Sequence, residues 1–304
     1  MQHAPTIQST RWLGSHLPVS YAAGVSSAHE ITEFAIAVAR KAGAIALTGF
    51  RDPHLEVAQK RDQYDVVTRL DTECEAHIRR AILATYPDST IVGEEDAEVT
   101  GTGALSWFVD PIDGTSNFGR GIAMWAVSIG VARHGEIISG VVFDPVADQL
   151  FWADARGAFL TTAGGSRPLQ STGSADPAQA TVVMNFPLAR DLVHFPDLAL
   201  TQFAQVTREF AQVRMLGSTC ITLCWLAAGW IDATVSFETS AWDVAAAAFI
   251  VRRAGGTYIA YRDGSAQPAE RDFVHAHYYA AVSGADFPTL REIMATQSQR
   301  PSRA

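Results

Sequence analysis

The sequence predicts an N-terminal α+β half and a C-terminal α/β half, with helical and sheet layers that alternate through the molecule. Two patterns predict this division: helix-spaced and then β-rich apolar runs in the first half, and strands alternating with helices in the second. Between them, residues 161–180 are rich in Gly, Ser, Thr and Ala, which indicates a domain boundary. The 304 residues suffice for one large domain or two packed ones with a substantial core.

This organisation gives four expected segments. Residues 1–26 form a flexible N-terminal extension without the clean hydrophobic core of a signal peptide. Residues 27–165 form the N-terminal domain, residues 166–296 the C-terminal domain, and residues 297–304 a tail.

Capping residues and apolar spacing predict the elements of the N-terminal half. Ser27 and Glu30 have the spacing of a capping box, and apolar residues follow at helical intervals as far as Ile45. A second helix is expected over residues 71–85, because Pro87 lies just beyond its end. Short apolar runs then predict strands over residues 91–92, 107–109, 125–131, 137–143 and 150–152.

In the C-terminal half, strand and helix patterns take turns. Strands are expected over residues 181–184, 212–216 and 233–235. Helices are expected over residues 198–210, from residue 218, and over residues 242–254, where Gly255 and Gly256 stop the helix. Further strands and a last helix near Pro288 complete the pattern.

The charge balance restricts the possible partners. A formal net charge of −9 argues against a protein that coats nucleic acid or a membrane surface, because both need a basic field. No apolar run approaches the roughly 18 residues of a membrane span. The cysteines, Cys74, Cys220 and Cys224, are odd in number and give no disulfide framework, so we expect a reducing compartment, the cytoplasm.

The motif with most chemical content is Asp110-Pro111-Ile112-Asp113, directly after an expected strand. A proline just past a strand end predicts a tight turn, in which both carboxylates and the Ile112 carbonyl can converge on one point. Hard divalent cations such as Mg²⁺ favour such all-oxygen sites. A calcium-stabilised loop, or an acidic turn with solvated carboxylates, remains an alternative for this motif alone.

The next residues, Gly114-Thr115-Ser116, predict a place for an anion. Glycine lets the backbone approach a ligand closely, and Thr or Ser is a good N-cap for a short helix starting here. Free N–H groups at a helix start beside a divalent metal form a phosphate site. Thr115 adds a hydroxyl able to orient a water.

Together with two distant acidic segments, this motif resembles the inositol monophosphatase family, within the lithium-sensitive, metal-dependent sugar phosphatases. The resemblance covers roughly residues 28 to 290 and rests on four ordered segments: Asp65 to Thr68 with Asp71, Gly93-Glu94-Glu95, Asp110 to Thr115, and Trp242-Asp243. It implies a layered αβαβα sandwich, hydrolysis of a small phosphomonoester with two to three Mg²⁺ ions, sensitivity to Li⁺, and a homodimer.

The resemblance also implies roles for individual residues. The metal ligands would be Glu94, Asp110, the Ile112 carbonyl, Asp113 and Asp243. Thr115, hydrogen-bonded to Asp71, would with Glu94 activate the attacking water. The N–H groups of Gly114, Thr115 and Ser116 would hold the phosphate, and Lys60 would lie near the metal–phosphate cluster.

Substrate recognition is where the sequence departs from the family. The segment expected to contact the alcohol is Arg214 with Gly217, Ser218 and Thr219. The sugar-binding glutamate seven residues before the Trp-Asp aspartate is replaced by Ser236, and the nearest acid is Glu238. Inositol monophosphate or a similar polyol phosphate is the leading substrate. The alternatives are a histidinol-phosphate phosphatase, a fructose-1,6-bisphosphatase, a 3′(2′),5′-bisphosphate nucleotide phosphatase, and more remotely a catalytically silent metal-binding scaffold.

Overall fold

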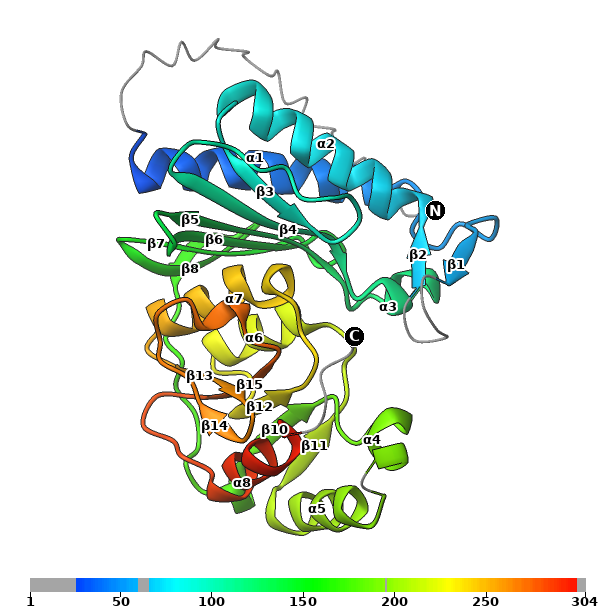
Figure 1. Ribbon diagram of the computed structural model, residues 1–304, viewed down its shortest axis with the longest axis vertical. Helices are drawn as coiled ribbons and strands as arrows, with labels where there is room; N and C mark the ends of the chain where they lie inside the picture. The colour runs from blue at the N-terminus through cyan, green and yellow to red at the C-terminus, as the bar shows by residue number, and fades with distance from the viewer. Residues whose placement is uncertain (1–25, 60–65, 195, 300–304) are drawn as a thin grey trace, which may run out of the picture.

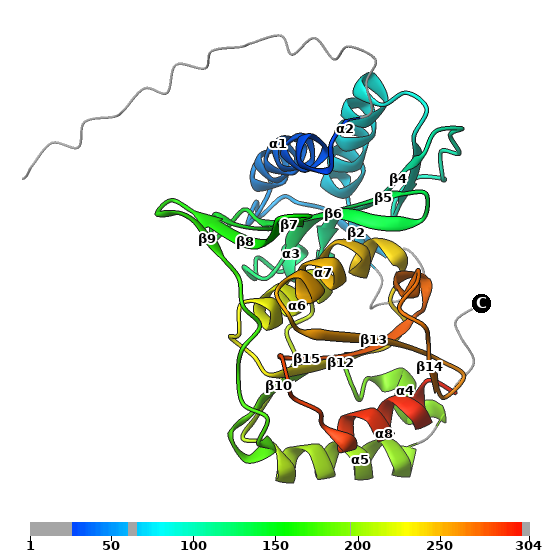
Figure 2. The same ribbon diagram turned by 90° about the vertical axis from the view of Figure 1, so that its left-hand side faces the viewer.

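The computed structural model describes residues 26–59, 66–194 and 196–299. Helical and sheet layers alternate through it in the order αβαβα, as Figures 1 and 2 show, which confirms the predicted sandwich. Within the described residues, no helix is both long and apolar enough to cross a membrane. The cysteines Cys74, Cys220 and Cys224 are buried and free.

The first helical layer consists of α1 (Ala28–Leu47) and α2 (Arg69–Thr85). The predicted capping box is present, because Ser27 Oγ accepts from Glu30 N (3.2 Å) and Glu30 accepts from Ser27 N (2.7 Å). Helix α2 starts two residues earlier than predicted, because Thr68 Oγ1 caps it by accepting from Leu70 N.

A seven-stranded sheet lies beneath these helices. Its strands, in spatial order, are β3 (Thr90–Gly93), β4 (Leu105–Asp113), β5 (Ala126–Arg133), β6 (Glu136–Asp144), β7 (Gln149–Asp154), β8 (Gly157–Thr162) and β9 (Gly165–Pro168). Strands β3 and β4 are parallel and the other neighbours antiparallel. The sheet thus extends three residues beyond the expected division at residue 165. A small hairpin, β1 (Val57–Gln59) with β2 (Val66–Thr68), was not predicted.

The middle layer contains α6 (Thr219–Ala227) and α7 (Ala241–Arg253). Helix α7 lies unusually close to the first sheet, where Gly130 and Gly140 pair across β5 and β6. A Cβ on Gly140 would stand 2.4 Å from the carbonyl oxygen of Ala246, and one on Gly130 would stand 2.9 Å from the Cβ of Ala245. The alanines of α7 and these glycines therefore allow the close approach.

The second sheet and the outer helices complete the sandwich. The sheet has the order β11 (Gln212–Arg214), β10 (Thr181–Met184), β12 (Ala233–Ser236), β15 (His277–Ala281), β13 (Thr257–Arg262) and β14 (Ser265–Ala266). Its first three strands are parallel. The outer helices are α4 (Ala189–His194), α5 (Pro196–Glu209) and α8 (Pro288–Gln297), with short 3-10 turns at Pro177–Gln179 and Asp272–Val274.

The contact between α7 and the sheet makes Gly140 intolerant of a side chain. Gly140→Ala should lower the free energy of unfolding by about 1–3 kcal/mol, because the new methyl group meets backbone that must move. Gly164→Ala is the matched control, since its nearest contact would be an ordinary 3.6 Å. Chemical denaturation of both variants measures the difference, and equal midpoints would contradict the close packing.

Candidate active site

The acidic site begins where β3 and β4 end. These strands are parallel, so their carboxyl ends lie at the same edge of the sheet and bring Glu94 towards Asp110. The proximity is visible in the electrostatics, because Glu94 is among the causes that raise the pKa of Asp110.

Strand β4 does not turn after Asp110, so the predicted tight turn is wrong. The strand continues to Asp113, with a shift of register between Asp110 and Asp113 opposite β5. In a regular strand, residues three apart point to opposite faces, and a bulge changes this relation. The irregularity at Pro111 therefore lets both carboxylates join one cluster.

The short helix after the motif also differs from the prediction. Helix α3 (Thr115–Gly119) has Gly114 as its N-cap, at φ 95°, and neither Thr115 nor Ser116 takes that place. A Cβ on Gly114 would stand 2.8 Å from the carbonyl oxygen of Met124. Glycine is needed here for its positive φ and for the close contact.

Asp113 is held by the start of α6, in the other half of the molecule. It accepts hydrogen bonds from Thr219 N (3.1 Å), Cys220 N (2.9 Å) and Ser218 Oγ. A helix N-terminus favours negative charge, so α6 stabilises this carboxylate. The Ser218 hydroxyl, expected to contact substrate, contacts this predicted metal ligand.

Asp243 reaches the same cluster from the first turn of α7. Its carboxylate accepts from Ser240 N (2.7 Å), which fixes the side chain beside the helix start. Burial is the largest cause that raises the pKa of Asp243, and the neighbouring Glu94 and Asp113 raise it further. Asp243 therefore lies close to Glu94 and Asp113, two of the predicted metal ligands from the first half.

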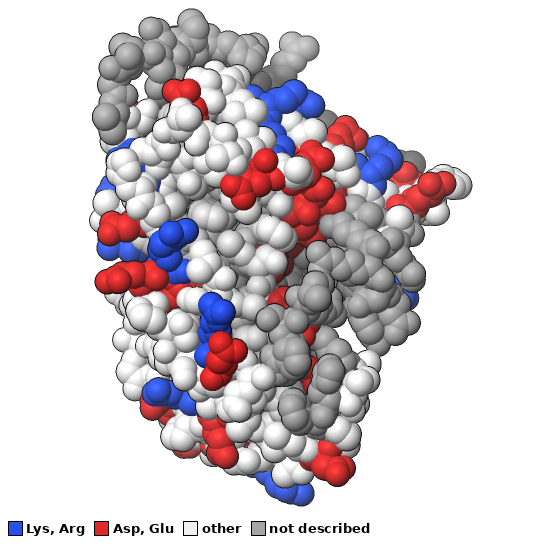
Figure 3. All heavy atoms as spheres, in the orientation of Figure 1, with Lys and Arg blue, Asp and Glu red and all other residues white. Residues whose placement is uncertain are grey.

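The cluster brings several carboxyl groups together in a buried place. The side chains of Asp110 and Asp113 are almost fully buried, and burial, above all, raises both pKa values. For Asp110 the neighbours Glu94, Asp113, Asp243 and Asp71 raise the pKa further. Figure 3 shows acidic side chains gathered where the two halves meet. Such repulsion is relieved by a cation, and oxygen donors of this kind suit Mg²⁺.

The ligand geometry itself is not preformed. Among the residues that the structure describes, no three His, Cys, Asp or Glu side chains stand together as a ready metal site. The carboxylates are bonded to protein donors instead, as for Asp110, which accepts from Ile112 N (3.0 Å). The donor chemistry thus fits a hard cation, whose binding would replace some of these hydrogen bonds.

Thr115 and Asp71 form the hydrogen bond that the family resemblance implies, at 3.1 Å. Thr115 Oγ1 also lies 3.0 Å from the carbonyl oxygen of Ile112. Asp71 is oriented by Thr68, whose N and Oγ1 donate to its second oxygen at 2.8 and 2.6 Å. Burial raises the pKa of Asp71 to about 6, so its carboxylate is largely ionised at neutral pH and can accept from Thr115.

A cavity of about 450 Å³ opens beside Asp113, at the carboxyl ends of the parallel strands of the second sheet. This edge is where open α/β sheets bind ligands. The lining comes from both halves: Asp113, Ser116, Asn117, Val183, Met184, Asn185, Leu188, Met215, Leu216, Gly217, Ser218, Thr219, Thr222, Thr234, Val235, Ser236 and Tyr278.

Of the predicted substrate contacts, Gly217, Ser218 and Thr219 line this cavity, whereas Arg214 and Glu238 do not. Arg214 is exposed at the end of edge strand β11 and donates to the carbonyl oxygen of Val213. Glu238 is half-buried at a positive φ of 59°. Lys60 lies outside the described residues.

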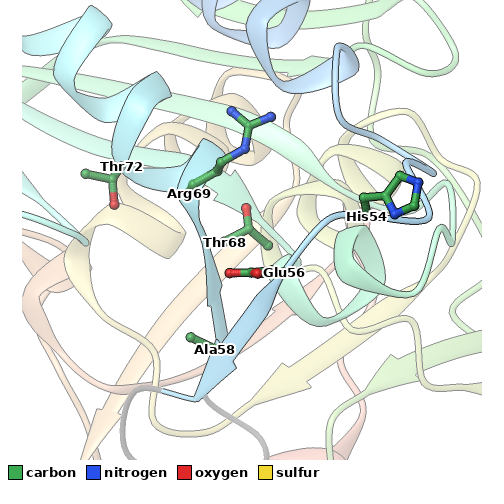
Figure 4. Close-up of a pocket in the computed structure, with 6 residues that line it drawn as sticks. All are labelled: His54, Glu56, Ala58, Thr68, Arg69 and Thr72. Atoms are coloured by element: carbon green, nitrogen blue, oxygen red, sulfur yellow. The ribbon is translucent and has the colours of Figure 1, made fainter.

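A smaller cavity of about 370 Å³ lies along the β1–β2 hairpin and the start of α2 (Figure 4). Its described lining consists of His54, Glu56, Ala58, Thr68, Arg69 and Thr72, and none of these is a predicted site residue. Thr68 belongs to this lining and also donates hydrogen bonds to Asp71.

The sequence did not reveal Asn117, which ties the two walls of the larger cavity together. Its Nδ2 donates to the carbonyl oxygens of Met124 and Leu216, both at 2.8 Å. Leu216 belongs to the other half and precedes Gly217. The local signal was only an amide in a short helix, and such a residue has many other uses.

Known proteins resemble this chain in sequence and in fold. The model of the inositol monophosphatase family matches residues 27–297. Nus factor SuhB of Pasteurella multocida is 33% identical over 233 residues, 76% of this chain and 85% of that protein. The fructose-1,6-bisphosphatase/inositol-1-monophosphatase of Aquifex aeolicus is 32% identical over 230 residues, 74% and 84% of the two chains. The crystal structure of extragenic suppressor protein suhB of Bartonella henselae superposes with a TM-score of 0.74 at 26% identity, over 88% of this chain and 99% of that one.

The fold, the acidic site and these relatives define a phosphatase, a hydrolase of phosphoric monoesters. Its substrates are small phosphorylated molecules. The chain belongs to the inositol monophosphatase family, in which dependence on a metal is general.

Removing one charge from the cluster should separate stability from metal binding. In Asp110→Asn the carboxamide oxygen can keep the bond from Ile112 N, while the repulsion of a buried charge disappears. Without metal, this variant should be at least as stable as the native chain. At Mg²⁺ near 100 times its dissociation constant, the native chain should gain about 2.7 kcal/mol and the variant much less.

Thermal unfolding with chelator and with Mg²⁺ measures both effects. Asp144→Asn is the control, because burial and not neighbouring carboxylates raises the pKa of Asp144. An Asp110→Asn variant that keeps the full response to Mg²⁺ would contradict the assignment.

Proposed function

We propose that this phosphatase hydrolyses the monophosphate of a small polyol, such as inositol monophosphate, with Mg²⁺ as its metal. One observation carries the proposal: Asp113 belongs both to the buried carboxylate cluster and to the lining of the 450 Å³ cavity. A phosphoryl group at this boundary would have the metal ligands on one side and room for its alcohol on the other.

The proposed ligands of two to three Mg²⁺ ions are Glu94, Asp110, the Ile112 carbonyl, Asp113 and Asp243. When bound, the metal would neutralise phosphoryl charge and lower the pKa of water. The chain's own contribution is orientation. Asp71 accepts the Thr115 hydroxyl hydrogen, which leaves the lone pairs of Thr115 Oγ1 free to accept from an attacking water. Glu94 would assist as a base, and the N–H groups of Gly114, Thr115 and Ser116 would hold the phosphate.

The cavity favours a monophosphate over a bisphosphate. Among its described lining residues there is no Lys, Arg or His, Asp113 has the only carboxyl group, and the other polar groups are hydroxyls and amides. A second phosphate would find no cation in this lining, and Asp113 would repel it. A neutral alcohol, in contrast, meets hydroxyls at Thr234, Ser236 and Tyr278.

A panel of substrates with Mg²⁺ tests this function: inositol monophosphate, histidinol phosphate, fructose 1,6-bisphosphate and an adenosine 3′,5′-bisphosphate. Inositol monophosphate should give the highest kcat/KM, and chelation should remove the activity. Equal feeble rates on all four, or preference for a bisphosphate, would overturn the polyol assignment. We also expect inhibition by Li⁺, a homodimer by light scattering, and a cytoplasmic location.

The Thr115 hydroxyl should act in turnover more than in folding. Thr115→Val keeps the volume but removes the hydroxyl, so kcat should fall by about 100-fold or more. Thr115→Ser keeps the oxygen and should retain much of the activity. Steady-state kinetics at saturating Mg²⁺ measures the effect, and a fully active Thr115→Val would rule out this role.

A further inference from the structure

Two charged side chains of α2 bind the turn that follows β3, residues 94–97. Glu75 is fully buried and Arg79 is 7% exposed, and they pair at 2.7 Å between Arg79 Nε and Glu75 Oε1. Burying two charges costs free energy, which good geometry and further hydrogen bonds must offset. The partners of these further bonds are all in the turn.

Glu75 accepts the backbone N–H groups of the turn. Its Oε2 accepts from Glu95 N at 2.9 Å, and its Oε1 accepts from Asp96 N at 3.1 Å. Gly93 leaves room for this contact, because a Cβ there would stand 2.3 Å from Glu75 Oε1. The carboxylate thus holds the two residues that follow Glu94.

Arg79 holds the carbonyl groups of the same turn. Its Nη2 donates to the carbonyl oxygen of Asp96 at 2.8 Å, and its Nη1 donates to that of Ala97 at 3.0 Å. With its bond to Glu75, the guanidinium is fixed in three directions. The pair therefore satisfies four backbone groups in the segment that carries Glu94.

We propose that Glu75 and Arg79 are positioning residues, which hold the turn after β3 so that Glu94 stays directed towards the carboxylate cluster. This inference rests on the proposed role of Glu94 as a ligand. The turn points at the cluster, because Glu94 affects the pKa values of Asp110 and Asp243, and Glu95 affects that of Asp71. Residues behind a ligand set its orientation and thereby the affinity for metal.

The test measures Mg²⁺ binding by calorimetry and amide hydrogen exchange of the turn in metal-free protein. Glu75→Gln leaves one oxygen for two N–H groups, so exchange at Glu95 and Asp96 should become faster. The dissociation constant of Mg²⁺ should rise about 10- to 100-fold. Glu73→Gln is the matched control, because Glu73 forms an exposed pair with Arg69 on the same helix, and it should leave both readouts unchanged.

A double variant separates positioning from folding. Glu75→Gln with Arg79→Met removes both charges, so it leaves no unpaired buried cation and should regain stability. It should still bind Mg²⁺ weakly. Native affinity in the double variant, or native exchange and affinity in Glu75→Gln, would overturn the inference. A native chain that binds no Mg²⁺ would instead overturn the proposed function and, with it, this role.

Discussion

The repulsion among buried carboxylates is the constraint on which the arrangement of this protein depends. Glu94, Asp110, Asp113 and Asp243 come from three segments: the turn after β3, strand β4 and the start of α7. Burial raises the pKa values of the three aspartates, and neighbouring carboxylates raise those of Asp110 and Asp243 further. A buried charge is tolerated only where donors or a cation face it. Most of the donors that the protein supplies are backbone N–H groups. Their direction is set by the position of the helix to which they belong.

Two helices of the middle layer meet this need. The start of α6 donates to Asp113 and the start of α7 lies beside Asp243, so both helices direct their positive ends to the cluster. Helix α7 can come so near only because Gly130 and Gly140 face its alanines. The small volume of the glycines in β5 and β6 therefore determines how close the start of α7 comes to the carboxylates. These glycines contribute to the site although they do not contact it.

The sequence predicted best what is determined locally. The start of α1 at Ser27 and of α6 at Ser218 follows from capping by neighbouring residues, and both helices begin where expected. The bulge at Pro111, the cap at Gly114 and the clamp by Asn117 were not predicted, because each depends on contacts with distant segments. The bond between Thr115 and Asp71, 44 residues apart, was accessible through the family resemblance and through no spacing rule.

The composition of the cavity wall has a consequence for the evolution of substrate specificity. Most of its wall comes from segments of the second half, such as Leu188, Met215 and Ser236, whereas Glu94, Asp110, Asp113 and Thr115 belong to the first. Mutations in the wall can alter which alcohol fits while the acidic cluster stays intact. Most residues of the acidic cluster and most residues of the cavity wall are therefore encoded in different parts of the sequence. Proteins of this fold can change substrate specificity by mutations in the second half while the hydrolytic site in the first half is conserved.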